Sequence, residues 1–220
     1  SIIGWGAPNK NNTSEIHGAP MGEEEIRLTK QVYGWPEDKQ FFVPPEVPQL
    51  FQQNLGVRGL KAREAWEAKF AAYRKEYPEL AKQLEQMWRH ELPEGWDAEM
   101  VPFAADPKGM ATRASSSKVL NQVAKCFPWL VGGSADLAPS NLTQLKFEGA
   151  GDFSAENYGG RTFHFGIREH AMAAICNGMA LCGLRSFGAT FFVFSDYLRH
   201  SLRLSSLMKL PVLYIFTHDS

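Results

Sequence analysis

Glu169 is the residue of this chain whose position most clearly predicts chemistry. It falls on the first turn of an expected apolar helix, directly after a run with the composition of a β-strand. Further along, Phe191, Phe194 and Tyr197 recur at the three-residue spacing of a turn or a helix. Burial disfavours the ionised form of a carboxyl group and so keeps its proton near neutral pH. A protonated carboxyl group beside flat apolar rings would suit an aromatic heterocyclic cofactor.

This pairing suggests thiamine diphosphate as the cofactor. Its aminopyrimidine works when a neutral carboxyl group hydrogen-bonds a ring nitrogen and promotes the imino tautomer, which removes the acidic proton of the thiazolium carbon. Each half of the pattern has an ordinary alternative. Glu169 could complement a helix N-terminus or pair with Arg168 at the surface, and the aromatic residues could be plain core packing. Only the combination favours a cofactor site.

Arg113 and Ser140 are candidate ligands of an anion. Arg113 precedes a serine-rich helix start, and Ser140 follows Pro139 in an expected loop after a pair of glycines. An arginine fork and a hydroxyl group suit a phosphate, and a helix N-terminus adds a favourable field. The alternatives are a helix cap for the serine and a solvated charge for the arginine.

His17 and His218 are placed among small and polar residues, in a loop and after a strand. Because histidine titrates near neutral pH, either could polarise a substrate hydroxyl or contact a phosphate. A solvated surface histidine is the alternative for both. No cluster of His, Cys, Asp or Glu has metal-ligand spacing, so no metal site built wholly from this chain is predicted.

The second half of the sequence predicts an α/β fold with a mostly parallel sheet flanked by helices. Helices and strands alternate from Arg113 onward, which is the pattern of parallel sheets. The expected strands are 129–131, 162–165, 186–192 and 212–216, and the expected helices are 115–126, with Ser115–Ser117 as its cap, 168–181 and 195–208. Ligands of such sheets bind at the carboxyl ends of the strands, where the candidate residues fall.

A helical linker region is expected before this sheet. Ile2-Ile3 predicts a short strand followed by a loop to His17, and the acidic residues 23–25 begin a helix. Residues 32–48 predict an irregular connector. Apolar residues then recur at helical steps from Trp66 to Met87, with Pro78 ending one helix and beginning the next.

Composition excludes several classes of function. Of 220 residues, 44% are hydrophobic and 21% are charged, and the formal net charge is −1 without a block of like charges. Because no block of positive charge is present, a nucleic-acid partner is not expected. A membrane partner is not expected either, because no apolar run approaches the roughly 18 residues that span a bilayer. Three cysteines without a CxxC pair predict reduced, buried thiols in a reducing compartment.

The ends of the chain indicate a piece of a longer protein. The sequence begins without Met at Ser1 and stops just after the strand-like run 211–216. A domain that ended there would expose unpaired backbone groups. We expect residues 1–92 to be the end of one domain with its helical linker, 93–109 to be a linker, and 110–220 to be a second, truncated domain.

Several strings of this chain resemble the transketolase family. They are Ile2-Ile3-Gly4-Trp5-Gly6-Ala7-Pro8-Asn9-Lys10, Ile16-His17-Gly18-Ala19-Pro20, Gly132-Gly133-Ser134-Ala135-Asp136-Leu137-Ala138-Pro139-Ser140-Asn141-Leu142-Thr143, Phe165-Gly166-Ile167-Arg168-Glu169-His170-Ala171-Met172 and Thr217-His218-Asp219-Ser220. The resemblance covers essentially the whole chain, with the strings in family order. It implies the thiamine diphosphate-binding fold, with the end of the diphosphate-binding domain followed by most of the pyrimidine-binding domain.

The resemblance also implies a role for individual residues. Glu169 resembles the glutamate that activates thiamine diphosphate, and His17 an active-site histidine near cofactor and substrate. The implied cofactor contacts are Phe191, Phe194, Tyr197, Leu137, Ile3 and His17, with Asp136 and Leu137 near both the cofactor and the subunit interface. The implied substrate ligands are His17, Arg113, Ser140 and His218. The ligands of Mg²⁺ or another divalent cation are implied to lie before Ser1, in a Gly-Asp-Gly string and a downstream Asn.

The activity implied for the parent protein is transfer of a two-carbon ketol unit between sugar phosphates, in the pentose phosphate pathway or the Calvin cycle. The implied assembly is a homodimer with the active site at the subunit interface. The implied location is the cytoplasm, or the plastid stroma for a plant or algal protein. Two alternatives stay open: dihydroxyacetone synthase, and a fragment that is inactive without the missing domains.

Overall fold

The computed structural model describes residues 1–98 and 100–219. Residue 99 of the expected linker and Ser220 of the last family string lie outside the described residues. The chain divides into two compact units, residues 1–70 and 71–220, and each is described by itself. In the described part of the chain, no helix combines the length and the apolarity needed to cross a membrane.

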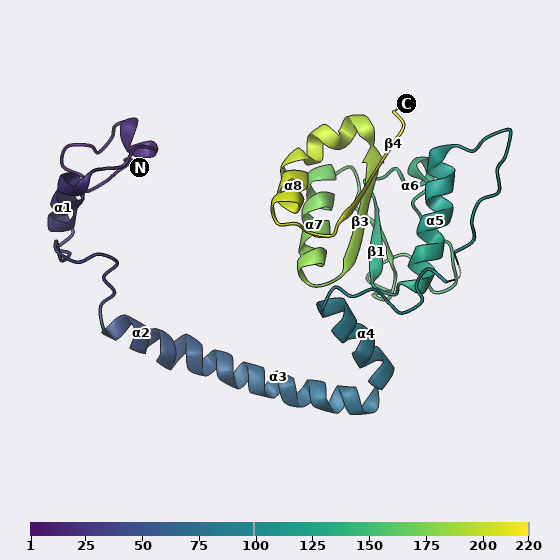
Figure 1. Cartoon of the computed structure of the whole chain (residues 1–220), viewed down its shortest axis with the longest axis horizontal. Helices are drawn as coiled ribbons and strands as arrows, with labels where there is room; N and C mark the ends of the chain where they lie inside the picture. Colours follow the sequence, from purple (N-terminus) through teal and green to yellow (C-terminus); the bar gives the residue numbers. More distant parts are fainter. Residues whose placement is uncertain (99, 220) are drawn as a thin grey trace. The chain divides into compact units, whose positions relative to one another are not determined.

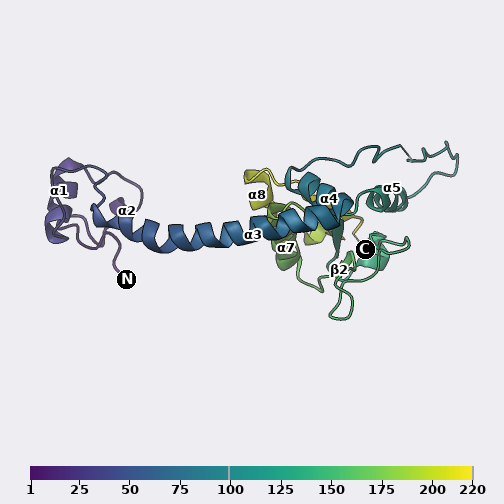
Figure 2. The same ribbon diagram turned by 90° about the horizontal axis from the view of Figure 1, so that it is seen from below.

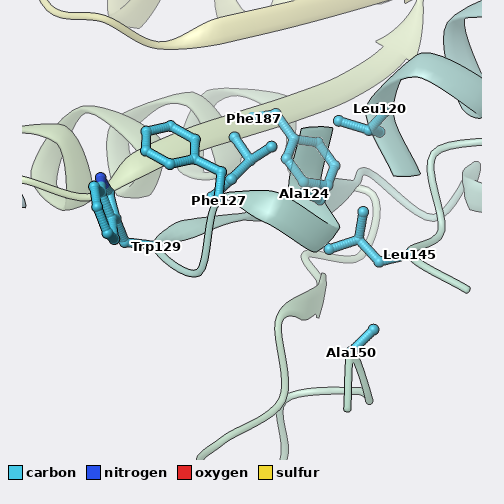
Figure 3. Packing of buried hydrophobic residues seen from close by; sticks show 8 residues of the cluster. Leu120, Ala124, Phe127, Trp129, Leu145, Ala150 and Phe187 are labelled. Atoms are coloured by element: carbon cyan, nitrogen blue, oxygen red, sulfur yellow. The ribbon is translucent and has the colours of Figure 1, made fainter. Parts of the chain in front are cut away.

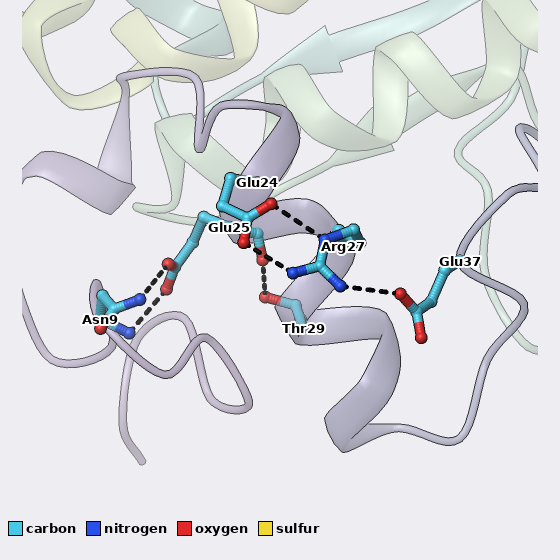
Figure 4. A network of polar contacts seen from close by, with 6 residues as sticks. All are labelled: Asn9, Glu24, Glu25, Arg27, Thr29 and Glu37. Atoms are coloured by element: carbon cyan, nitrogen blue, oxygen red, sulfur yellow. Dashed lines mark hydrogen bonds and ion pairs between the residues drawn. The ribbon is translucent and has the colours of Figure 1, made fainter.

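The first unit is built around α1 (Glu23–Val32), with a short 3-10 helix, η1, at Glu15–His17. The side chain of Glu25 is buried, and its carboxylate accepts hydrogen bonds from the backbone N–H of Asn9 at 2.7 Å and from the Asn9 side-chain amide at 2.9 Å (Figure 4). It also accepts one from the N–H of Lys10 at 3.0 Å. The bond from the Asn9 side chain is the main cause that lowers the pKa of Glu25. One acidic side chain thus fixes the N-terminal loop to the helix.

The expected strand at Ile2-Ile3 is wrong. These residues lead into tight turns, in which the N–H of Ala7 donates to the carbonyl of Gly4 at 3.0 Å. Gly4 and Gly6 have positive φ angles of 65° and 91°, which turn the chain back and prevent an extended run.

The expected helices around Pro78 are confirmed. After α2 (Glu46–Phe51) and a π-helical turn, η2 (Gln52–Gly56), come α3 (Val57–Glu76) and α4 (Pro78–Trp88). Tyr77 leaves the helical conformation with φ −128° and ψ 66°, and Pro78 occupies the first turn of α4, where its missing N–H costs nothing.

The predicted parallel sheet is confirmed in the second unit, and among the described residues it has four strands in the order β2-β1-β3-β4 (Figure 1). The strands are β1 (Leu130–Ser134), β2 (Thr162–His164), β3 (Arg185–Phe191) and β4 (Leu213–Thr217). The helices are α5 (Thr112–Cys126), α6 (Ala138–Asn141), α7 (Glu169–Leu181) and α8 (Ser195–Leu207), with η3 (Phe192–Phe194) before α8.

Helices cover both faces of the sheet, each over its own hydrophobic core. On one face, α5 packs against β1 and β3 through a cluster that includes Leu120, Ala124, Phe127 and Phe187 (Figure 3). On the other, α7 and α8 pack through Met172, Ala173, Cys176 and Leu198. Figures 1 and 2 agree in placing α5 on one side and α7 with α8 on the other. The unit is therefore a three-layer α/β sandwich.

Three details of the expected elements are corrected. Ser140 does not lie in a loop, because the short helix α6 spans Ala138–Asn141. Ser115–Ser117 do not cap α5, because the helix begins at Thr112 and the hydroxyl of Ser115 donates to the Thr112 carbonyl at 2.9 Å within the first turns. The glycine pair does not follow the first strand but belongs to it, since β1 runs through Gly132 and Gly133. Of the cysteines expected to be buried, Cys176 is buried but Cys182 is exposed.

A buried polar network fixes the position of α7. The side-chain amide of Asn177 donates to the carbonyl of Ser201 on α8 at 2.9 Å, and its oxygen accepts from the Tyr214 hydroxyl on β4 at 3.1 Å. The Ser186 hydroxyl on β3 donates to the carbonyl of Cys176 at 2.8 Å. Because α7 begins with Glu169, these bonds also fix the height of that carboxyl group relative to the sheet.

Candidate functional site

The candidate residues of the second unit gather at the carboxyl edge of the sheet. β1 leads to Leu137 and Ser140, β2 to Glu169, β3 ends at Phe191, and β4 is followed by His218. The chain moves from β1 to β2 on one side and then to β3 on the other side of β1. Such a reversal of strand order opens a crevice at the carboxyl ends, which is the usual ligand position in open α/β sheets.

Arg113, Ser140 and His218 come together although they lie far apart in the sequence. One guanidinium nitrogen of Arg113, Nη1, donates to the backbone carbonyl of Ser140 at 3.1 Å and lies 2.9 Å from Nε2 of His218. Arg113 and His218 also line a pocket of about 510 Å³, together with Ser116 and Thr217. A guanidinium, a hydroxyl and an imidazole around one pocket are suited to binding a phosphate.

An aromatic row continues from this cluster. The ring of Phe191 lies 5.1 Å from that of His218 and 5.9 Å from that of Phe194, which in turn lies 6.0 Å from Tyr197. Phe191 ends β3 and is 8% exposed, whereas Tyr197 on α8 is 65% exposed. The row therefore leads from the core to an open surface at which a flat ring could stack.

Glu169 is buried, with 7% of its surface exposed, at the first position of α7. In the described part of the chain its carboxylate has neither a hydrogen-bond partner nor an ion-pair partner. Pairing with Arg168 does not occur, because that guanidinium donates to the carbonyl of Phe165 at 3.1 Å. The helix N-terminus still favours a negative charge here, so that alternative role is compatible with the geometry.

Leu137 is held at the end of β1 by a network that the sequence did not reveal. Its N–H donates to the hydroxyl of Ser134 at 3.2 Å, and that hydroxyl lies 2.8 Å from Oδ1 of Asn141. The amide of Asn141 donates to the hydroxyl of Thr217 at the end of β4. The sequence offered one indication of this network: Asn141 and Thr217 are next to the candidate ligands Ser140 and His218 in the family strings 132–143 and 217–220.

Ile3 and His17 belong to the other compact unit. Ile3 is 44% exposed, and His17 ends η1 as an exposed residue. Both are thus accessible on the surface of their own unit.

The described residues contain no group of three or more His, Cys, Asp or Glu side chains arranged to hold a metal ion.

Comparison with protein families matches nearly all of the chain. The pyrimidine-binding domain of transketolase matches residues 108–220, and the thiamine diphosphate-binding domain of transketolase matches residues 1–93. The chain belongs to the transketolase family. Transketolases of Bacillus subtilis and Nostoc are 54% and 43% identical over the full chain. A chloroplastic transketolase of Arabidopsis thaliana is 45% identical over the full chain.

Solved transketolase structures have the same fold. The Pichia stipitis transketolase in complex with sedoheptulose 7-phosphate is 37% identical, with a TM-score of 0.80, and the Leishmania mexicana transketolase is 37% identical, with a TM-score of 0.81. The match covers the full chain in both cases, and 33% and 32% of those structures. It covers 33%, 32% and 29% of the Bacillus, Nostoc and Arabidopsis relatives. The chain thus spans about a third of the transketolases it matches. All these relatives are named transketolase, so they do not favour the dihydroxyacetone synthase alternative.

Proposed function

We propose that the protein containing this chain is a transketolase that transfers a two-carbon ketol unit from a ketose phosphate to an aldose phosphate, in the pentose phosphate pathway or the Calvin cycle. The observation that carries the proposal is the convergence of Arg113, Ser140 and His218 beside the aromatic row. The family supports it, as does the relative that binds sedoheptulose 7-phosphate.

The residues at the carboxyl edge fit thiamine diphosphate. A buried carboxyl group, Glu169, would hold a proton at a ring nitrogen of the aminopyrimidine, and Phe191, Phe194 and Tyr197 would enclose that ring. Leu137 and Ile3 would add apolar contacts. When bound, the cofactor supplies the reactive carbon and the electron sink, while the protein supplies orientation and electrostatics.

The protein's own groups would orient the substrate. Arg113, Ser140 and His218 would bind the sugar phosphate, which places the other end of the sugar at the reacting centre. His17 would contact the substrate and the cofactor diphosphate. The divalent cation that accompanies the diphosphate would take its ligands from outside this chain.

We further infer the organisation of the whole enzyme. Residues 1–92 would end the diphosphate-binding domain and its helical linker, 93–109 would form a connector, and 110–220 would belong to the pyrimidine-binding domain. The active site would form between the subunits of a homodimer. Exposed side chains within and beside the aromatic row, at 65% for Tyr197, 63% for Phe192 and 52% for Val193, support such an interface. The location would be the cytoplasm, or the plastid stroma in a plant or alga.

Kinetics of the full-length enzyme test this proposal. With thiamine diphosphate, Mg²⁺ and a ketose phosphate donor, we expect kcat/KM to be higher for ribose 5-phosphate than for formaldehyde. A preference for formaldehyde would assign the protein to the dihydroxyacetone synthases. Absence of ketol transfer to either acceptor would contradict the proposed function.

A further inference from the structure

A buried polar network connects three elements at the carboxyl edge. Asn141, at the end of α6, is 1% exposed, and Ser134, at the end of β1, is 2% exposed. The Ser134 hydroxyl lies 2.8 Å from Oδ1 of Asn141 and 2.9 Å from the carbonyl of Ala189 on β3. The Asn141 amide donates to the hydroxyl of Thr217 at the end of β4. The side chain of Asn141 thus joins β1 to β4.

The network is adjacent in sequence to the proposed phosphate ligands. Asn141 directly follows Ser140, and Thr217 directly precedes His218. Arg113 closes the arrangement from the other side, because it contacts the carbonyl of Ser140 at 3.1 Å and the ring of His218 at 2.9 Å. The separation of Ser140 and His218 is therefore set by a buried bond on one side and a guanidinium on the other.

The backbone on both sides of α6 adopts an unfavourable conformation that surrounding contacts must stabilise. Asp136, before this helix, has a φ of 60°, and Leu142, directly after Asn141, has a φ of 57°. Residues other than glycine adopt this left-handed conformation at a cost, and it persists where surrounding contacts determine it. The buried hydrogen bonds of Asn141 are contacts of this kind, since they fix the end of the short helix to two strands.

We propose that Asn141 is a positioning residue for the substrate phosphate, and that its bond to Thr217 sets the enzyme's preference for phosphorylated over non-phosphorylated sugars. This inference rests on the proposed function. Asn141 is too deeply buried to touch a substrate, so it acts through Ser140 and His218. Contacts to a phosphate remote from the reacting carbon are made alike in the ground state and the transition state. Their loss raises KM and leaves kcat unchanged.

Two variants of the full-length enzyme test the bond from its two ends. Asn141→Leu removes the amide at a position that cannot reach the substrate. Thr217→Val removes the hydroxyl group at nearly constant shape, but Thr217 also lines the pocket, so a rise in KM counts for the network only if Asn141→Leu shows it as well. We expect both to raise the KM and the calorimetric Kd for ribose 5-phosphate about five- to tenfold, the effect of one buried hydrogen bond. The kcat, and the KM for ribose without its phosphate, should stay at the wild-type values.

Matched controls separate this effect from general damage. Thr217→Ser keeps the hydroxyl group and should stay within about twofold of the wild-type KM. Thr190→Val removes a buried hydroxyl on β3 that has no partner in the described part of the chain, and it should leave the KM unchanged. If Asn141→Leu does not fold, Asn141→Ala, which also removes the amide at this buried position, provides the measurement.

The outcomes distinguish this inference from the proposed function. An inactive wild-type enzyme contradicts the proposed function, while the Kd for ribose 5-phosphate still tests the network. If the wild-type enzyme is active, an unchanged KM in Thr217→Val overturns the inference. It is also overturned if KM rises equally for ribose and ribose 5-phosphate, or if folded Asn141→Leu keeps the wild-type KM.

Discussion

The side chain of Glu169 is buried, and its carboxylate has no hydrogen-bond or ion-pair partner in the described part of the chain. A polar group that is buried without a partner is unfavourable, and a bound ligand can satisfy it. Burial and the missing partner therefore mark Glu169 as a candidate ligand contact without reference to the family.

Glu169→Gln tests the proton-holding role. The amide has nearly the same shape, so the melting temperature should stay close to that of the wild type, but it cannot exchange a proton at the cofactor ring. We expect kcat for ketol transfer in the full-length enzyme to fall by about 100-fold or more, the range of general acid–base effects. Glu156→Gln, at an exposed position, is the control and should retain normal turnover. Near-normal turnover of Glu169→Gln would reject the role.

Arg113→Ala tests the phosphate contact. Removing the guanidinium should raise the KM for a phosphorylated acceptor about 10- to 100-fold, as expected for a charge-assisted hydrogen bond, with a smaller effect on kcat. Steady-state kinetics measure both parameters. Arg63→Ala removes an exposed arginine that pairs with Glu67 on α3 and should change neither. An unchanged KM in Arg113→Ala would remove this residue from the site.

At the scale of elements, α7 connects the hydrophobic core to the candidate site. Asn177 bonds it to α8 and β4, and Ser186 bonds it to β3. Next to these bonds, burial raises the pKa of the Cys176 thiol to about 12, so this cysteine acts as a small apolar core residue. Glu169 begins the same helix, so the hydrogen bonds that hold α7 also fix the position of Glu169.

Asn177→Leu should destabilise the protein by about 2–4 kcal/mol, because it leaves the Ser201 carbonyl and the Tyr214 hydroxyl without this buried partner. The midpoint of chemical denaturation of the full-length protein measures the loss. Asn157→Leu removes a single exposed bond, to the carbonyl of Asp152, and should cost less than half as much. Equal losses of stability in the two variants would show that the buried network stabilises the protein no more than a single exposed hydrogen bond.

The elements were largely predictable from sequence, and their side-chain networks were not. Periodicity and Pro78 report on local structure, and they located the parallel strands of the described residues and helices α5, α7 and α8 to within a few residues, but not the short helix α6. The Ile2-Ile3 strand failed because β-branched composition cannot outweigh two glycines that turn the chain. The bond between Asn141 and Thr217 joins residues 76 apart, and local pattern carries no information about such a contact.

At the scale of the whole molecule, two compact units each hold part of the candidate set. Ile3 and His17 lie in the first unit, and the residues at the carboxyl edge lie in the second. The sequence indicated membership of the family through its strings, and only that resemblance, not periodicity, led to the proposal of a role for Ile3 and His17.

The isolated 220-residue chain should show no ketol transfer. It spans about a third of the transketolases it matches, and the proposed ligands of the divalent cation lie outside it. Turnover of ribose 5-phosphate and a ketose phosphate, with thiamine diphosphate and Mg²⁺ added, is the assay, and the full-length enzyme is the positive control. Measurable ketol transfer by the isolated chain would contradict this prediction.

The glycine pair in β1 has a consequence for mutational tolerance. A Cβ atom at Gly133 would lie 1.8 Å from the carbonyl oxygen of Phe163, and one at Gly132 would lie 2.1 Å from that of Phe187. Both obstacles are backbone atoms of neighbouring strands, so no rotamer change relieves them. In a saturation library selected for activity, alanine should be depleted at both positions as strongly as tryptophan. Loss of activity on substitution of Gly132 or Gly133 would then result from the close spacing of the strands and not from a lost contact with a ligand.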